Sequence, residues 1–252
     1  MRRQIMTYYL SIDYGGTNTK ALIFDKLGHQ IAVSSFETLK NEAQSGHRQV
    51  NLVKTWNAIT SAIREVIQIS KLSPEQISAV ACIGHGKGLY LLDNKLEPLE
   101  QGILSTDNRA KDLAQYFESK LDNIWELTRQ HIFPSQSPVI LRWLKDYQPE
   151  TYKSIGAVLS AKDFIRYKLT GKVQQEYGDA SGNHWINFQT GTYDPAILDF
   201  FGIREIENSL PELIDSADLV PGGISSQAAK ETGLVEGTPV VGGLFDIDAC
   251  AL

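Results

Sequence analysis

The chain has 252 residues, of which 42% are hydrophobic and 21% are charged. This length predicts one large domain or two small ones, with enough buried surface to fold without a disulfide or a metal. Its 24 basic and 30 acidic side chains give a net charge of −6, which argues against a nucleic-acid partner. The apolar content excludes a disordered chain and a collagen-like repeat.

The cysteines and the apolar segments indicate the cellular location of the protein. Cys82 and Cys250 form no CxxC pair, so neither a disulfide framework nor a structural zinc site is expected. Asp13 interrupts the apolar run after the basic N-terminus, and no signal-peptide cleavage site follows. No stretch approaches 18 apolar residues. We therefore expect a cytoplasmic protein with no membrane partner.

The first third of the chain predicts an antiparallel meander followed by a long helix. Three segments have the residue pattern of strands and are separated by glycine-containing turns: 8–14, 19–25 and 30–37. From Asn51 onwards apolar residues recur every three or four positions, which predicts a helix over 51–69 with Asn51 as its N-cap. The apolar stripe of this helix is expected to face the core.

The rest of the chain alternates strands and helices. After a capping-box turn that begins at Ser73, we predict the following elements: strands 79–83 and 89–93, mostly helices over 108–170, loops with short strands over 172–195, a helix over 225–232 and a strand over 239–244. The order of these elements places the chain in the mixed α/β class. Of the four tryptophans, Trp185 alone is expected outside the core, because it follows polar neighbours in a loop.

A polar, glycine-containing motif occupies the turn between the first two predicted strands. Because it joins strand to strand, it is neither a Walker loop nor a Rossmann loop, both of which begin a helix. Its glycines would let backbone N–H groups approach an anion, and its first carboxylate could organise a metal ion through water. An ordinary hairpin with polar decoration is the alternative. The candidate phosphate-binding residues are Asp13, Gly15, Gly16, Thr17, Asn18, Thr19 and Lys20.

This octapeptide resembles the first phosphate motif of the actin–hexokinase–chaperone ATPase superfamily. Further segments resemble one branch of it, the FGGY carbohydrate kinases, and among those most of all the L-xylulose kinases. The segments that carry the resemblance are Ile83–Asp93, Ile103–Ala110, Ile140–Lys145, Ala161–Gly171, Asp179–Gly182 and Gly237–Asp246. They follow the family's order and extend over residues 8–252, after an N-terminal tail of residues 1–7.

The resemblance implies a ribonuclease-H-like domain with a mixed sheet flanked by helices. It implies phosphorylation of a hydroxyl of a small sugar, a pentulose such as L-xylulose, with ATP and Mg²⁺. Asp246 matches the catalytic base, which accepts the proton of the attacking hydroxyl. Asp13 matches the position that organises the magnesium ion and the phosphates.

The resemblance also assigns sugar-binding residues. His85 and Lys87 fall on the family's sugar-binding turn, and Asp107 falls on a second sugar loop, where Arg109 is expected to hold it. Lys87 stands where many xylulose kinases have a histidine, so its partner on the substrate could be a keto-sugar hydroxyl or a carboxylate. A loop that contains Asp179 and Ser181 is also expected near the site.

Family members continue with a second domain of similar size that supplies most of the nucleotide site, and this chain would be the N-terminal half. On its own it should turn over little or no substrate, and the exposed domain interface leaves a homodimer as an option. One alternative is a non-catalytic sugar-sensing or regulatory module. Another is a glucokinase-like repressor or kinase, which the absence of a cysteine-rich zinc segment disfavours.

Overall fold

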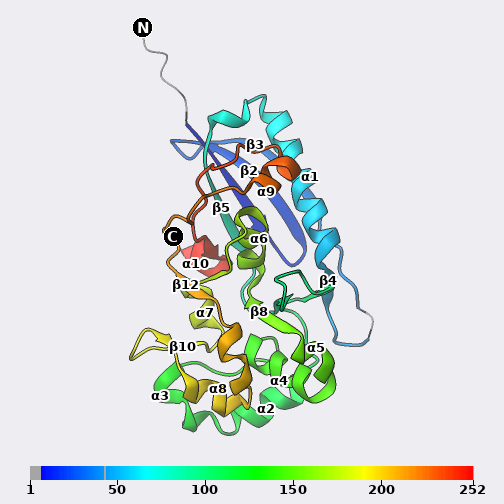
Figure 1. Cartoon of the computed structure of the whole chain (residues 1–252), viewed down its shortest axis with the longest axis vertical. Coiled ribbons are helices and arrows are strands. Elements are labelled where there is room, and N and C mark those ends of the chain that lie inside the picture. Colours follow the sequence, from blue (N-terminus) through cyan, green and yellow to red (C-terminus); the bar gives the residue numbers. More distant parts are fainter. Residues whose placement is uncertain (1–6, 43, 252) are drawn as a thin grey trace.

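The structure, a computed structural model, describes residues 7–42 and 44–251. The expected tail therefore lies almost wholly outside the described residues. A five-stranded mixed sheet in the order β13-β5-β1-β2-β3 forms the upper half of the molecule (Figure 1). Its strands are β1 (Tyr8–Tyr14), β2 (Asn18–Asp25), β3 (Gln30–Glu37), β5 (Ile77–Gly84) and β13 (Leu244–Phe245). The first three are antiparallel neighbours, and β5 and β13 run parallel to β1.

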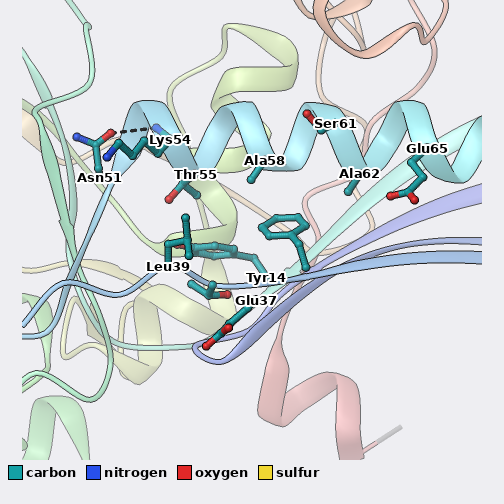
Figure 2. A pocket seen from close by; sticks show the side chains of 12 residues that line it. Tyr14, Glu37, Leu39, Asn51, Lys54, Thr55, Ala58, Ser61, Ala62 and Glu65 are labelled. Atoms are coloured by element: carbon teal, nitrogen blue, oxygen red, sulfur yellow. Dashed lines mark hydrogen bonds between the residues drawn. The ribbon is translucent and has the colours of Figure 1, made fainter.

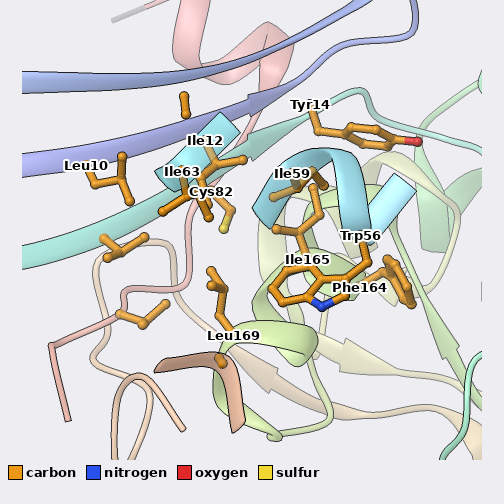
Figure 3. Packing of buried hydrophobic residues seen from close by; sticks show 14 of the residues in the cluster. Leu10, Ile12, Tyr14, Trp56, Ile59, Ile63, Cys82, Phe164, Ile165 and Leu169 are labelled. Atoms are coloured by element: carbon orange, nitrogen blue, oxygen red, sulfur yellow. The ribbon is translucent and has the colours of Figure 1, made fainter. Parts of the chain in front are cut away.

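Two helices pack against this sheet, α1 (Leu52–Ser70) and α6 (Ala161–Thr170), and α9 (Ser226–Thr232) packs against both of them. Every second residue of β1 is buried, as a strand with one covered face requires. Leu10 and Ile12 of β1 meet Ile59 and Ile63 of α1 in one hydrophobic core (Figure 3). The helix begins where its sequence predicts, because the Asn51 side chain accepts a hydrogen bond from the Lys54 N–H at 2.9 Å.

The lower half of the molecule is mostly helical and has its own buried cluster (Figure 1). Its helices are α2 (Lys111–Glu118), α3 (Trp125–Thr128), α4 (Ser137–Tyr147), α5 (Pro149–Lys153), α7 (Tyr177–Gly182) and α8 (Pro195–Phe201), with 3-10 turns at Leu121–Asn123 and Arg204–Ser209. Outside the central sheet, eight short strands form four two-stranded sheets among the described residues: β4 (Gln49–Asn51) with β7 (Gln101–Ile103), β6 (Tyr90–Asp93) with β8 (Ile155–Leu159), β9 (Gln174–Glu176) with β12 (Glu212–Ile214), and β10 (Ile186–Asn187) with β11 (Thr192–Tyr193). A 3-10 turn at Pro74–Gln76 confirms the predicted capping box. The C-terminal helix is α10 (Asp246–Ala251).

The three meander strands, the long helix and the mixed α/β class are confirmed. Four predictions need correction. Strand β8 lies inside the stretch predicted as mostly helical, helix α7 lies in the predicted loops, and the last strand is confined to Leu244–Phe245. Trp185 is only 1% exposed and belongs to the lower core, because its ring packs inward from the loop after α7. Among the described residues, no helix is long and apolar enough to cross a membrane.

Candidate functional site

Two carboxylates lie at one edge of the central sheet. Asp13 on β1 and Leu244 on β13 are both in register with Ile83 of β5, so Asp246 begins its helix two residues beyond that level. Burial raises the pKa of Asp13; the ammonium group of Lys20, its cross-strand neighbour, opposes this, and the negative charge of Asp246 adds to it. The two predicted acidic residues, 233 positions apart in sequence, are thus close enough to interact electrostatically.

The hairpin between β1 and β2 is tight at Gly15, whose N–H donates to the Asn18 carbonyl at 3.1 Å, and open at Gly16. A Cβ on Gly15 would lie 2.6 Å from the Asn18 carbonyl oxygen, so this position requires glycine. A Cβ on Gly16 would meet nothing within 4 Å, which leaves open space beside its backbone. Thr38, which follows β3, braces the turn by donating its hydroxyl to the Gly15 carbonyl at 2.9 Å.

Only some of the predicted hairpin donors face outward. The Thr17 and Asn18 side chains are exposed at the tip. Thr19 is buried, and its hydroxyl shares a 3.0 Å hydrogen bond with the Thr38 hydroxyl, so it stabilises the hairpin from within. Lys20 is exposed beside Asp13 and supplies a positive charge on the side where phosphates would lie.

The turn that follows β5 packs directly against the residue that precedes Asp246. A Cβ on Gly86 would lie 1.8 Å from the Phe245 ring, so only glycine allows this contact. At the other end of the turn, the Gly88 N–H donates to the Ser135 carbonyl at 2.7 Å, and the Ser137 hydroxyl donates to the Gly88 carbonyl at 2.7 Å. The turn is therefore fixed between Phe245 and the segment that leads into α4.

His85 is buried at the start of this turn, and neighbours occupy both of its ring nitrogens. Its Nε2 lies 2.9 Å from the Tyr90 hydroxyl, and its Nδ1 lies 3.3 Å from the Gly86 carbonyl oxygen. Burial lowers the pKa of His85, which keeps the ring neutral. In this arrangement His85 orients the turn and has no nitrogen free for a sugar.

Lys87 presents its charge differently. Its side chain is partly buried, and its backbone has the left-handed conformation (φ 61°). The Nζ atom lies 4.0 Å from the centroid of the Phe133 ring. No ion pair to Lys87 occurs among the described residues. Sequence reasoning did not identify Phe133, which nothing in the local pattern distinguishes from a core aromatic residue.

Asp107, the third predicted sugar ligand, is only 2% exposed. The Arg109 guanidinium donates to both of its oxygens at 2.9 Å, as expected, and the Arg48 N–H donates to one of them at 2.6 Å. Both oxygens are therefore occupied, and Asp107 joins its loop to the segment before β4. The structure does not bring its carboxylate together with Lys87.

A buried ion cluster lies beside the site, and local sequence patterns do not predict most of it. Lys162 on α6 is fully buried, and its Nζ lies 3.1–3.2 Å from oxygens of Asp163, Glu176 and Asp179. Burial opposes the charge of this lysine, but the three carboxylates together hold the pKa of Lys162 above its ordinary value. Asp179 is thus engaged within this cluster. Its helix α7 contacts β13, so the segment with Asp179 and Ser181 does lie near the candidate site, as expected.

The cluster continues to the segment that carries Asp246. Arg166, also fully buried, donates to the carbonyl of Gly242 and lies 2.6 Å from Asp163. Ser181, the other residue expected from this loop, donates its hydroxyl to the Gly178 carbonyl within α7. The sequence signal that could have revealed the cluster is the i,i+3 spacing of Asp163 and Arg166 on a helix.

The described residues contain no group of three or more His, Cys, Asp or Glu side chains that could hold a metal ion. The two carboxylates Asp13 and Asp246 nevertheless fit Mg²⁺, which is commonly held by one or two carboxylates together with water and substrate phosphates. The charge of Lys20 opposes the raised pKa of Asp13, and a divalent cation held by these carboxylates would reduce the repulsion from Asp246.

A cavity of about 450 Å³ lies behind the hairpin, between α1 and the end of β3 (Figure 2). Tyr14 and Leu39 line it on one side, and Thr55, Ala58 and other α1 residues line it on the other. It is not lined by Asp13, Lys87 or Asp246. The candidate site is therefore the edge of the sheet and not this cavity.

The comparisons with known proteins identify the family of the chain. The family model for the N-terminal domain of the FGGY carbohydrate kinases matches residues 8–252. The chain belongs to the FGGY family. It is 36% identical, over 98% of its length, to a probable L-xylulose kinase of Pasteurella multocida, and 36% identical, over 97% of its length, to an L-xylulose/3-keto-L-gulonate kinase of Escherichia coli. It spans about half the length of these curated relatives, 51% and 49%.

Solved FGGY structures share the fold. A xylulose kinase from Rhodospirillum rubrum superposes with a TM-score of 0.89 at 22% identity, over 98% of this chain and 51% of that one. A gluconate kinase from Lactobacillus acidophilus gives a TM-score of 0.87 at 24% identity, over 96% of this chain and 48% of that one. The predicted ribonuclease-H-like, actin-like ATPase fold is thereby confirmed.

Proposed function

We propose that the chain is the sugar-binding half of an ATP-dependent carbohydrate kinase that phosphorylates a hydroxyl of a small sugar. The observation that carries the proposal is the pairing of Asp246 with Asp13 beside an open glycine hairpin in an FGGY-family domain. A second domain of similar size would complete the nucleotide site. The names of the relatives make a pentulose such as L-xylulose the first substrate to test.

Each residue has a distinct task in this proposal. The Asp246 carboxylate accepts the proton of the attacking sugar hydroxyl. The hairpin tip at Gly16, with open space beside its backbone, and the ammonium of Lys20 would orient the phosphates of ATP, and Asp13 would orient the magnesium ion bound to them. Magnesium supplies charge neutralisation on the transferred phosphoryl group. The hydrogen bonds that fix the turn at Gly88 hold the sugar-facing wall in place.

The two free thiols support one further proposal, which concerns location. Cys82 is buried and Cys250 is exposed, and neither forms a disulfide. An exposed free thiol is typical of proteins in a reducing compartment. We therefore place the protein in the cytoplasm.

The first test replaces Asp246 with asparagine in the full-length protein. ADP release that depends on L-xylulose should fall by roughly 10²- to 10⁴-fold, because the general base is lost. Binding of the sugar, measured by calorimetry, should change by less than about threefold, because the amide keeps the size of the carboxyl group.

Asp248→Asn is the matched control, since it removes the same charge from the same helix at an exposed position. This variant should retain nearly full activity. Equal losses in the two variants would remove Asp246 from its proposed role. Sugar binding with no sugar-dependent ADP release in the unmodified protein, over a panel of pentuloses and polyols, would instead favour a sugar-sensing module.

A further inference from the structure

Three buried aromatic rings join the phosphate hairpin to the turn after β5. Tyr14 is the last residue of β1 and directly follows Asp13, His85 begins the turn, and Tyr90 begins β6. The ring centroids lie 5.7 Å apart for Tyr14 and His85, 6.1 Å for Tyr14 and Tyr90, and 5.8 Å for His85 and Tyr90. Each ring therefore contacts the other two, and all three residues are buried.

Polar contacts run through the same three residues. The His85 N–H donates to the Tyr14 carbonyl at 3.2 Å. The Tyr90 hydroxyl lies 2.9 Å from Nε2 of His85 and 3.4 Å from the Tyr14 hydroxyl. Burial raises the pKa of both tyrosines, so both hydroxyls keep their protons and remain hydrogen-bond donors. The Tyr90 hydroxyl thus lies between the first residue of the turn and the residue that precedes the hairpin.

These contacts continue where the pairing of β1 with β5 ends. The last pair of this parallel ladder is Tyr14 with Gly84, and His85 is the next residue along the chain. Tyr14 is also held from the other side by a hydrogen bond with Thr55 of α1. A displacement of the turn would therefore act on Tyr14 through Tyr90 and His85, and from Tyr14 on the hairpin that follows it.

Packing alone does not require a hydroxyl at position 90. A phenylalanine would place a ring in the same space, and a buried hydroxyl is costly unless it finds partners. Within a dry core such a contact is strong and restricts the geometry of its partners. The hydroxyl of Tyr90 therefore has a positioning effect that its ring does not supply.

We propose that Tyr90 is a positioning residue, whose hydroxyl fixes the turn after β5 relative to the phosphate hairpin, so that bound sugar raises the affinity for ATP. This inference rests on the proposed kinase function and adds the contact by which its two substrate segments influence each other. Tyr90 has no exposed surface, so it touches neither substrate and acts through His85 and Tyr14. Because coupling between two sites is reciprocal, bound ATP would raise the affinity for sugar by the same factor.

The experiment measures this coupling in the full-length protein. Calorimetry gives the dissociation constant of the non-hydrolysable ATP analogue AMP-PNP, with Mg²⁺, in the absence and presence of L-xylulose or the member of the sugar panel that supports ADP release. The ratio of the two constants is the coupling factor, and it should be roughly 5 to 150 in the unmodified protein. Tyr90→Phe keeps the ring and removes the hydroxyl, so the factor should fall by about 3- to 10-fold. Binding of AMP-PNP without sugar should change by less than about threefold.

Tyr14→Phe tests the other end of the contact and should also lower the coupling factor. Because both hydroxyls act through one contact, the loss in the double variant should be clearly smaller than the product of the two single losses. Tyr152→Phe is the matched control, since this tyrosine of the lower half is also buried and its hydroxyl lies 3.4 Å from an oxygen of Glu205. Its coupling factor should equal that of the unmodified protein.

A purely structural role of Tyr90 would lower the unfolding temperature of Tyr90→Phe and leave the coupling factor unchanged, which would overturn the inference. Fully multiplicative losses in the double variant, an equal loss in Tyr152→Phe, or no coupling in the unmodified protein would also overturn it. If Tyr90→Phe does not fold, Tyr14→Phe decides by the same criterion. In each of these cases sugar-dependent ADP release that requires Asp246 would leave the kinase proposal standing. If no sugar is bound or phosphorylated, both proposals fail.

Discussion

Two desolvated lysines, 75 positions apart in sequence, occupy opposite electrostatic environments. Lys162 is fully buried within 3.1–3.2 Å of three carboxylates, and its pKa is raised. Lys87 is only partly buried, has an aromatic ring as its neighbour, and its pKa is lowered. The comparison shows that burial alone does not determine the pKa or the role of a lysine. The carboxylates that the fold places around it decide whether its charge serves the structure or remains for a ligand.

The ion cluster around Lys162 connects several elements of the fold, whereas Lys87 does not. It connects α6 with β9 and α7, and through Arg166 it reaches the carbonyl of Gly242, shortly before Asp246. Lys87, by contrast, contacts the Phe133 ring and forms no ion pair among the described residues. Loss of Lys162 should therefore damage the fold, whereas loss of Lys87 should damage only recognition.

The largest effect is expected from Lys162→Met. The substitution leaves Asp163, Glu176 and Asp179 buried with Arg166 as the remaining cation, so the free energy of unfolding should fall by about 3–5 kcal/mol. Lys87→Met should cost less than about 1 kcal/mol, because it breaks no ion pair. Urea unfolding followed by circular dichroism measures both values.

The double variant Lys162→Met/Asp179→Asn separates charge from packing. Burial raises the pKa of Asp179 to about 6, against the opposing charge of Lys162, so this carboxylate is the one most easily neutralised. If unpaired charge causes the loss, the double variant should be more stable than Lys162→Met alone. A loss below about 1 kcal/mol in Lys162→Met would show that the cluster contributes little, and the comparison of the two lysines would fail.

A second prediction concerns the pH dependence of stability in the lower half, near Lys87. Burial lowers the pKa of His184 from its ordinary value of 6.5 to about 4, so the unfolded chain binds a proton at higher pH than the folded one. The stabilisation is then complete above pH 6.5 and is lost as the pH falls toward 4, by roughly 3 kcal/mol in total. His184→Asn should flatten this part of the stability profile, and asparagine tolerates the left-handed backbone there (φ 57°).

His29→Asn is the matched control, because His29 is an exposed histidine on the turn before β3. Its profile between pH 4 and 7 should follow that of the unmodified protein closely. Thermal unfolding at half-unit steps of pH distinguishes the variants. An unchanged slope in His184→Asn would mean that His184 is not held neutral, and a second positive charge would then lie near Lys87.

The upper half of the fold follows from local sequence patterns, and the lower half does not. Strands β1 to β3 and helix α1 show alternating or helical periodicity because each has one face on the core and one in solvent. Strand β8 is buried at four of its five residues and so shows no such alternation. Its sequence is therefore predicted as part of a mostly helical stretch. Helix α7 contains two glycines in six residues, so its sequence reads as a loop.

The site divides in the same way. Asp13 and its hairpin are visible from the sequence, because a glycine pair between two strands is a local signal. The resemblance to a family located Asp246, whose approach to Asp13 is created by strand order and not by sequence spacing. The resemblance indicated that Arg109 holds Asp107, but neither route could show that the Arg48 N–H also binds this carboxylate, because that contact depends on two separate segments meeting in space.

The smallest effect tests whether the backbone at Lys87 is retained for recognition. Lys71, the C-cap of α1, has the same left-handed conformation (φ 58°). Lys71→Gly should raise the free energy of unfolding by about 0.5 kcal/mol, since glycine adopts this conformation without strain, whereas Lys71→Ala should give no gain. Lys87→Gly should give almost no gain, because loss of the contact with Phe133 offsets the relief. If Lys87→Gly were instead destabilising by more than about 1 kcal/mol, Lys87 would serve the fold as Lys162 does, and the contrast between them would disappear.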